Sequence, residues 1–139
     1  MAKITFPFPE ASEPDPLESD RLARIQARPT PQRYIASSVD SDGHIGALIE
    51  VRCETAFVRQ TAEFRQLVAD LARQVVVSDS HPAGPENSEV LNSAFDIEAF
   101  CRRPFIGDPN QTVTEIVQSL LLQIGENIVI DRVVRFTGT

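Results

Sequence analysis

The sequence predicts an α+β fold, a small antiparallel sheet of about three strands with helices packed on one face. Two apolar runs, residues 34–39 and 45–53, flank an Asp-Gly turn, which is the pattern of a β-hairpin. Two later segments, 62–76 and 113–124, repeat apolar residues with helical spacing. Residues 127–136 then alternate as a third strand. The expected order is strand, strand, helix, loop, helix, strand, without an internal repeat.

The predicted hairpin turns at Asp40-Ser41-Asp42-Gly43, where glycine supplies a positive φ without a steric clash. Because strand side chains alternate between two faces, one face of the second strand should be core and the other partly wet. The residues expected in the core are Ala47, Ile49, Val51 and Cys53, and those on the other face are Leu48, Glu50 and Arg52.

The first helix is expected to begin after Thr61, whose hydroxyl is suited to accept a hydrogen bond from an amide of the first turn. Its apolar residues follow the i, i+3, i+4, i+7 rule. They are Phe64, Leu67, Val68, Leu71, Ala72, Val75 and Val76. The segment 78–92 is polar and contains Pro82, Gly84 and Pro85, which predicts a loop.

The last helix has the clearest boundaries. Thr112 and Glu115 have capping-box spacing, and Gly125 stands where a C-terminal cap is expected. In the strand that follows, one apolar face is expected to carry Ile128, Ile130, Val134 and Phe136. A sheet of about three strands needs its second face covered to be stable. We therefore expect this face to form a homodimer or to pack against another subunit.

Residues 1–32 are predicted to form a proline-rich extended arm or tail, apart from a core domain at 33–139. Six of the ten prolines lie in this segment, and proline disfavours long helices and inner strands. The spacing leaves room for a short helical turn between Pro16 and Pro29. Phe6 and Phe8, each followed by proline, are the expected anchors if the arm lies against a partner; a disordered tail is the alternative.

Composition excludes several classes of function. The net charge of -7 argues against nucleic acid as the main partner, because that affinity rests on neutralising phosphates. No apolar run approaches the length needed to cross a bilayer, and the N-terminus has no signal-peptide pattern. We expect the cytoplasm, or an organellar matrix or stroma if this is a mature form. The two cysteines are expected to be reduced thiols.

The sequence gives no positive sign of an enzyme active site. His44 lies beside the hairpin turn and His81 in the predicted loop, and both are expected to be solvated loop residues. No spacing of Cys or His fits a metal site, and no Gly-rich loop fits a phosphate. We therefore predict a protein that is not an enzyme and that needs neither metal nor cofactor.

Phe57 lies on a short turn between Cys53 and Thr61. Two placements are open for it. The ring can cap the core under the following helix, or it can project as an aromatic anchor for a partner.

Three segments together resemble the core, or dimerisation, domain of elongation factor Ts. The first is Cys53-Glu54-Thr55-Ala56-Phe57-Val58, where family members typically have Asn-Cys-Glu-Thr-Asp-Phe-Val-Ala-Arg. The second is Arg103-Pro104-Phe105-Ile106-Gly107-Asp108-Pro109, and the third is Gly125-Glu126-Asn127-Ile128-Val129. The resemblance covers 33 to the C-terminus and does not include the family's N-terminal three-helix module.

The resemblance implies a role in protein biosynthesis as a guanine nucleotide exchange factor. In the family, the Thr-Asp-Phe-Val turn presses against the GTPase elongation factor Tu, and its Phe intrudes near the magnesium and phosphate site. Carried to this chain, the implied partner-binding residues are Thr55, Ala56, Phe57, Val58 and Arg59. The implied activity is to bind elongation factor Tu and promote GDP release.

The chain also departs from the family pattern. Ala56 stands where the family carries Asp, and Arg59 and Gln60 replace the usual Ala and a basic residue. The long helical segment of the family core is shortened to the predicted loop at 78–92. Two functions therefore remain open at this point. One is a minimal exchange factor, and the other is a non-exchanging protein that uses the fold as a structural or scaffold subunit of a larger complex.

Overall fold

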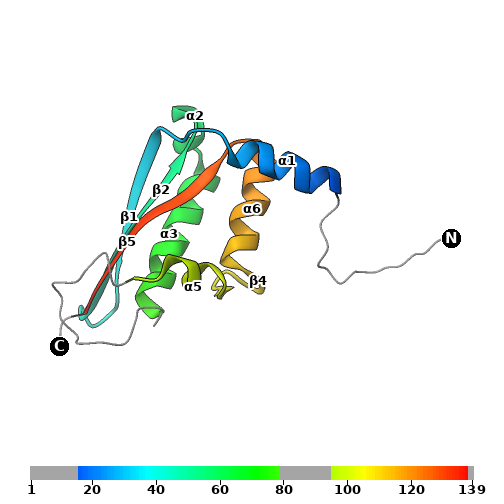
Figure 1. Cartoon of the computed structure of the whole chain (residues 1–139). Coiled ribbons are helices and arrows are strands. Elements are labelled where there is room, and N and C mark those ends of the chain that lie inside the picture. The colour runs from blue at the N-terminus through cyan, green and yellow to red at the C-terminus, as the bar shows by residue number, and fades with distance from the viewer. Residues whose placement is uncertain (1–15, 79–94, 138–139) are drawn as a thin grey trace.

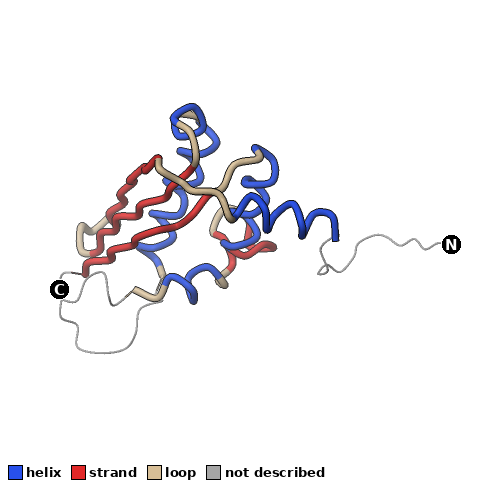
Figure 2. The backbone as a smooth tube through the Cα atoms, turned by 45° about the horizontal axis from the view of Figure 1, so that its top comes forward, coloured by secondary structure: helices blue, strands red, loops and turns tan. Residues whose placement is uncertain are grey.

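The computed structural model describes residues 16–78 and 95–137. Its elements are α1 (Pro16–Gln26), β1 (Gln32–Val39), β2 (Ile45–Cys53), α2 (Ala56–Arg59), α3 (Ala62–Val77), α5 (Ile97–Cys101), β3 (Pro104–Phe105), β4 (Asp108–Thr112), α6 (Val113–Ile124) and β5 (Ile128–Thr137). The main sheet is antiparallel in the order β1-β2-β5, and β3 pairs with β4. Helices α3 and α6 lie on one side of that sheet (Figures 1 and 2). The predicted fold class is confirmed.

The predicted hairpin is confirmed. Strands β1 and β2 pair in register from Gln32 opposite Cys53 to Val39 opposite Gly46. In the turn, Gly43 has φ 75° and the Asp40 carboxylate accepts the amides of His44 and Ile45 at 2.8 and 3.2 Å. These amides, that of Ile45 foremost, lower the pKa of Asp40. The four residues predicted for the core face, Ala47, Ile49, Val51 and Cys53, are all buried.

The pairing of β2 with β5 contains a β-bulge between Glu50 and Val51. On β5 the extra residue is Asp131, because Arg132 lies opposite Glu50 and Ile130 lies opposite Val51. A bulge shifts the alternation of side chains by one position. The expectation that β5 carries one apolar face is therefore wrong. Ile128 and Ile130 lie on the core face, whereas Val134 and Phe136 lie on the outer face.

The two predicted helices are confirmed with their caps. In α3 the Thr61 hydroxyl accepts the Phe64 amide at 3.3 Å. In α6 the capping box is complete: the Thr112 hydroxyl accepts the Glu115 amide, and the Glu115 carboxylate accepts the Thr112 amide. Gly125 adopts the left-handed conformation, with φ 76°, and ends the helix.

Between residues 95 and 112 the structure adds elements that the sequence did not predict, α5 and the β3–β4 pair. The side chain of the buried Gln74 joins them to α3: its amide nitrogen donates to the Pro104 carbonyl at 2.9 Å, and its oxygen accepts the Ile106 amide at 3.0 Å. The predicted loop 78–92 lies outside the described residues, except for Ser78.

Within the segment predicted as an arm or tail, residues 16–26 form α1, in the stretch between Pro16 and Pro29 where the spacing left room for a helical turn. Pro16 is the first residue of that helix, where a missing amide donor costs nothing, and the next proline is Pro29. The side chain of Ile25 is buried in the core. Phe6 and Phe8, the predicted arm anchors, lie outside the described residues.

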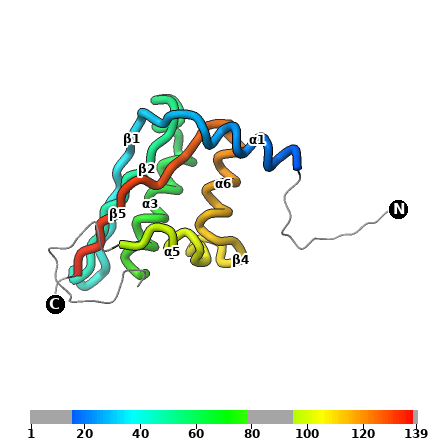
Figure 3. The backbone as a smooth tube through the Cα atoms, viewed as in Figure 1, coloured from blue at the N-terminus to red at the C-terminus, as the bar shows by residue number. Residues whose placement is uncertain are grey.

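Polar contacts also hold α1 and the residues after it against the end of α6 (Figure 3). Arg21 and Arg28 donate to the carbonyl oxygens of Leu122 and Gly125 at 3.0 and 2.9 Å. The Asn127 side-chain amide donates to the carbonyls of Gln26 and Arg28 at 3.3 and 2.8 Å. Residues 16–32 therefore pack with the core that was expected to begin at residue 33.

This packing generates a stability prediction. Replacing Ile25→Ala should lower the free energy of unfolding by about 2 kcal/mol or more, because a buried aliphatic side chain is truncated. The measurement is equilibrium unfolding in urea. On the same helix Leu17 is 77% exposed, so Leu17→Ala serves as the matched control and should change stability little. Equal effects of the two variants would contradict the packing of α1 on the core.

Candidate functional site

Phe57 projects from the molecule. It lies in α2, a single helical turn at one end of the sheet (Figure 1), and its side chain is 79% exposed. The adjacent Val58 is buried and fills the core position beneath the turn. Of the two placements that the sequence left open, the structure has the projecting one.

The turn that carries Phe57 is capped at both ends. The Thr55 hydroxyl accepts the Val58 amide at 3.3 Å, which caps the start of α2. The Thr61 hydroxyl donates to the Val58 carbonyl at 2.8 Å while it caps the start of α3. These two threonines satisfy backbone groups that a one-turn helix would otherwise leave without partners. The exposed aromatic ring therefore stands on a turn with a defined backbone.

Two glutamates join this turn to the residues that precede β5. The Glu126 carboxylate accepts hydrogen bonds from the amide of Thr55 at 3.2 Å and from the hydroxyl of Thr55 at 2.8 Å. In the other direction, the Glu54 carboxylate accepts the Asn127 amide at 2.6 Å. Arg28 forms an ion pair with Glu54 at 3.5 Å. We call these contacts of Glu54 and Glu126 the reciprocal clamp, since each segment supplies a carboxylate to the backbone of the other.

Cys53 lies below the clamp and is fully buried. Its thiol donates to the Thr55 carbonyl at 3.5 Å. Burial, followed by the negative charge of Glu126, raises the pKa of Cys53 to about 11. The side chain is therefore a protonated thiol at neutral pH, and it packs as a small apolar group.

The predicted site residues are not equivalent in the structure. Thr55, Ala56 and Phe57 are exposed, Arg59 is half-buried, and Val58 is buried. Val58 thus supports the turn from below rather than presenting its side chain at the surface. Ala56 is the first residue of α2, and that first turn contains no acidic side chain.

Glu126 is the residue that sequence reasoning missed. Its segment was recognised as a motif, but its contact with the Thr55 turn was not predicted. The pairing of β2 with β5 puts Cys53 opposite Ile128, and this places residues 54–55 beside 126–127. A prediction of strand register would have found the contact.

Two kinds of feature are absent from the part of the chain that the structure describes. Among residues 16–78 and 95–137 there is no group of three or more His, Cys, Asp or Glu side chains that could hold a metal ion. Over the same residues no helix is both long enough and apolar enough to span a membrane.

The reciprocal clamp generates a second prediction. Replacing Glu126→Gln removes the charge that holds Thr55 and should destabilise the turn locally, with a loss of about 1 kcal/mol in unfolding free energy. Amide hydrogen exchange should accelerate at Thr55 and Val58 and stay unchanged in α6. Glu63→Gln, an exposed glutamate in the first turn of α3, is the control for the loss of charge. Exchange rates that do not differ between the two variants would rule out the clamp.

The chain is similar in sequence to several curated proteins. No protein-family model matches it. It is 30% identical over 145 residues to elongation factor Ts of Rubrobacter xylanophilus, covering 82% of this chain and 74% of that protein. For elongation factor Ts of Methylacidiphilum infernorum the identity is 30% over 165 residues, and the coverage is 91% and 82%.

The match to elongation factor Ts of a Cyanothece strain is 30% over 141 residues, with 78% of this chain and 54% of the relative covered. The chain thus spans about half the length of that relative, about three quarters of the Rubrobacter protein and about four fifths of the Methylacidiphilum protein. The 145 aligned positions of the Rubrobacter match outnumber the residues of this chain that they cover, so the relative carries additional residues within the matched region. On this identity and coverage, the chain belongs to the elongation factor Ts family.

Proposed function

We propose that this protein binds elongation factor Tu and promotes the release of GDP, with Phe57 as the inserting side chain. The observation that carries the proposal is the 79% exposure of Phe57 on a turn fixed by two caps and the reciprocal clamp. Membership of the elongation factor Ts family supports it. The compartment that goes with this function is the cytoplasm, or an organellar matrix or stroma for a processed form.

The proposed mechanism is differential binding, without bond chemistry. A protein that binds the nucleotide-free GTPase more tightly than the GDP-bound form lowers the affinity for GDP by the same factor. An aromatic ring on a preorganised turn suits this task, because little conformational entropy is lost when it enters a partner. Glu126 contributes indirectly, by holding Thr55 and hence the start of α2.

Because Ala56 stands where family members have Asp, the exchange activity of this protein should be weaker than theirs. A truncated charged contact at an interface typically costs about 2–5 kcal/mol of binding free energy when the contact is buried. Ala56 is exposed in the isolated protein, so the missing carboxylate affects the complex and leaves the fold of the turn intact.

Stopped-flow release of a fluorescent GDP from elongation factor Tu tests the proposal. The protein should accelerate release, Phe57→Ala should remove most of the acceleration, and Ala56→Asp should strengthen it. Val77 is 70% exposed at the opposite end of the α3 helix, so Val77→Ala is the matched control and should act like the unchanged protein. No acceleration at micromolar protein would exclude exchange activity. Equal rates with Phe57→Ala would exclude the role of Phe57.

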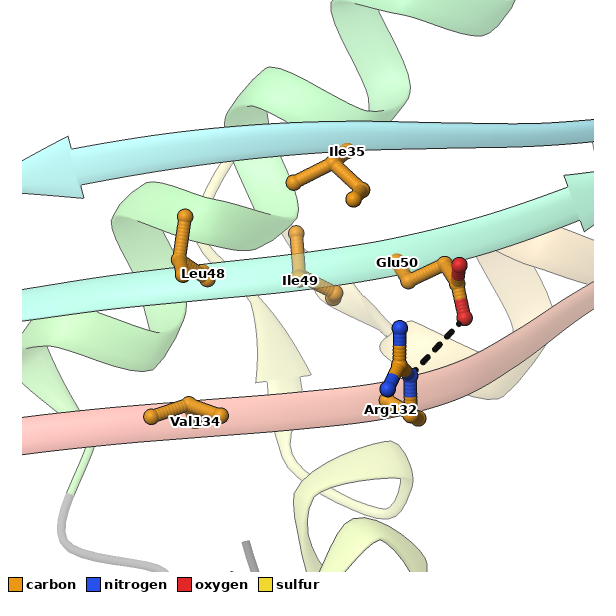
Figure 4. Close-up of a pocket in the computed structure, with 6 residues that line it drawn as sticks. All are labelled: Ile35, Leu48, Ile49, Glu50, Arg132 and Val134. Carbon is orange, nitrogen blue, oxygen red and sulfur yellow. Dashed lines mark hydrogen bonds and ion pairs between the residues drawn. The ribbon is translucent and has the colours of Figure 1, made fainter. Parts of the chain in front are cut away.

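A second candidate function is that of a structural or scaffold subunit, and the outer face of the sheet favours it. No described element covers that face, and its exposed apolar residues are Ile35, Val39, Leu48, Val129 and Phe136. A shallow cavity of about 150 Å³ lies on it (Figure 4). Glu50 and Arg132 both line the cavity. Glu50 is only 4% exposed, and Arg132 donates to it at 3.1 Å.

We propose that a second copy of the chain covers this outer face. The face carries both apolar side chains and the Glu50–Arg132 pair, so two copies related by a twofold axis can match apolar with apolar and charge with opposite charge. Packing against another subunit of a larger complex is the alternative occupant. Residues 1–15, with Phe6 and Phe8, are proposed to contact whichever partner is bound.

Light scattering over a range of concentrations tests self-association. The unchanged protein should be dimeric at tens of micromolar, and Leu48→Glu should shift it to a monomer by placing a charge in the buried face. Leu17→Glu changes an equally apolar, exposed side chain on α1 and should leave the dimer intact. A persistent monomer would contradict the homodimer, and co-purification of another protein at a fixed ratio would identify a foreign subunit instead.

A further inference from the structure

Two arginines beside the Phe57 turn are held in place without a carboxylate. Arg59 Nε donates to the Arg33 carbonyl, and Arg65 Nε donates to the Arg59 carbonyl at 3.3 Å. Both guanidinium groups lie over the ring of Tyr34, with centroid distances of 5.8 Å for Arg59 and 5.1 Å for Arg65. Tyr34 in turn packs edge-on against the buried Phe64. We call Arg59 and Arg65 the arginine pair.

These contacts orient the arginine pair and leave its charge uncompensated. The acceptors are neutral carbonyl oxygens and an aromatic ring, and the hydrogen bond of each arginine uses only the Nε–H. A guanidinium group has five N–H donors, so the terminal amino groups remain for other acceptors. Within the described ranges, no ion pair includes Arg59 or Arg65.

Several other arginines in the described part of the chain differ in this respect, although not all of them form ion pairs. Arg24, Arg52, Arg73 and Arg132 each lie within 3.3 Å of a carboxylate. In a protein with a net charge of -7, two unneutralised guanidinium groups on one side of an exposed phenylalanine form a local positive region. Solubility does not account for it, because positive groups reduce the magnitude of the net charge of an acidic protein.

We infer that Phe57 and the arginine pair form one recognition surface, whose protein partner has an apolar recess bordered by carboxylates on the side facing β1. The inference rests on the proposed function and gives the chemistry of the partner surface. Stacking on Tyr34 restricts both side chains before binding, so that less rotamer entropy is lost in forming bidentate contacts with carboxylates.

The position of the arginine pair also makes the two sides of the surface differ in charge. Arg59 is anchored to β1 through the Arg33 carbonyl, whereas Glu126 borders the turn from the β5 side. The turn is therefore basic on one flank and acidic on the other. A continuous phosphate backbone would meet the acidic flank as well, which favours a folded protein surface over a nucleic acid.

The test is the association kinetics of the full chain with elongation factor Tu·GDP at several salt concentrations. For the unchanged protein the association rate constant should fall at least about fivefold between low salt and about 0.3 M, because screening removes the attraction. The double variant Arg59→Glu/Arg65→Glu should associate slowly at all salt concentrations. Phe57→Ala should instead raise the dissociation rate and keep the salt dependence.

Two further variants separate charge from structure. Arg59→Lys/Arg65→Lys keeps the charge but loses the Nε contacts, so it should retain the salt dependence even if its thermal midpoint falls. Arg73→Glu reverses one charge, as each of the two glutamate substitutions does. Its site on α3 lies about 12 Å further along the helix than Arg65, and it should alter association less than about twofold. A salt dependence that survives the double glutamate variant overturns the inference.

A second probe keeps this result distinct from failure of the proposed function. If the unchanged protein does not bind elongation factor Tu, the proposed function fails. The inference is then tested by measuring the binding of an octaglutamate peptide and of a single-stranded RNA of equal charge. Binding of the peptide that is lost in Arg59→Glu/Arg65→Glu supports an acidic protein surface as partner. Tighter binding of the RNA, or no binding of either probe, overturns the inference.

Discussion

The pairing of β2 with β5 is the constraint on which the rest of this structure depends. It joins the end of the first motif to the start of the last, with Cys53 opposite Ile128, and so brings together carboxylates and amides more than 70 residues apart in the sequence. The reciprocal clamp can form only if that register is kept. Through it, the position of the Phe57 turn is determined by a strand at the far end of the chain.

The same pairing divides the surface into two regions. One is the turn beyond the end of β2, where Phe57 and the arginine pair lie, and the other is the outer face of the sheet. Strand β2 contributes to both, because Leu48 and Glu50 lie on the outer face and Thr55 follows the strand end. The turn is displaced along the strand from the outer face (Figure 1), so occupation of one region leaves the other accessible.

Features with local signals in the sequence were predictable. The hairpin turn at Gly43, the capping box of Thr112 and Glu115, and the left-handed Gly125 each depend on a few neighbouring residues. Two features depend on tertiary contacts and could not be derived in this way. The exposure of Phe57 depends on Val58 filling the space below, and α1 is stabilised by the burial of Ile25 and by contacts with the end of α6. The bulge at Asp131 could not be predicted either, because the alternation of apolar residues in β5 gives no signal for it.

The bulge at Asp131 changes which residues of β5 face the core. Before it the even-numbered residues Ile128 and Ile130 face the core, and after it the odd-numbered residues do. Arg135 therefore points toward α3 instead of away from it. Its guanidinium donates to the carbonyls of Val75 and Val76 at 2.9 Å, and the last turn of α3 has no basic residue of its own. Deleting one residue of β5 beyond Asp131 would reverse the faces of the residues that follow and take the cation away from the helix end, whereas deleting Asp131 itself would remove the bulge and keep those faces. The strand can therefore lose the bulged residue and keep its faces, whereas beyond the bulge only a change of two residues preserves them.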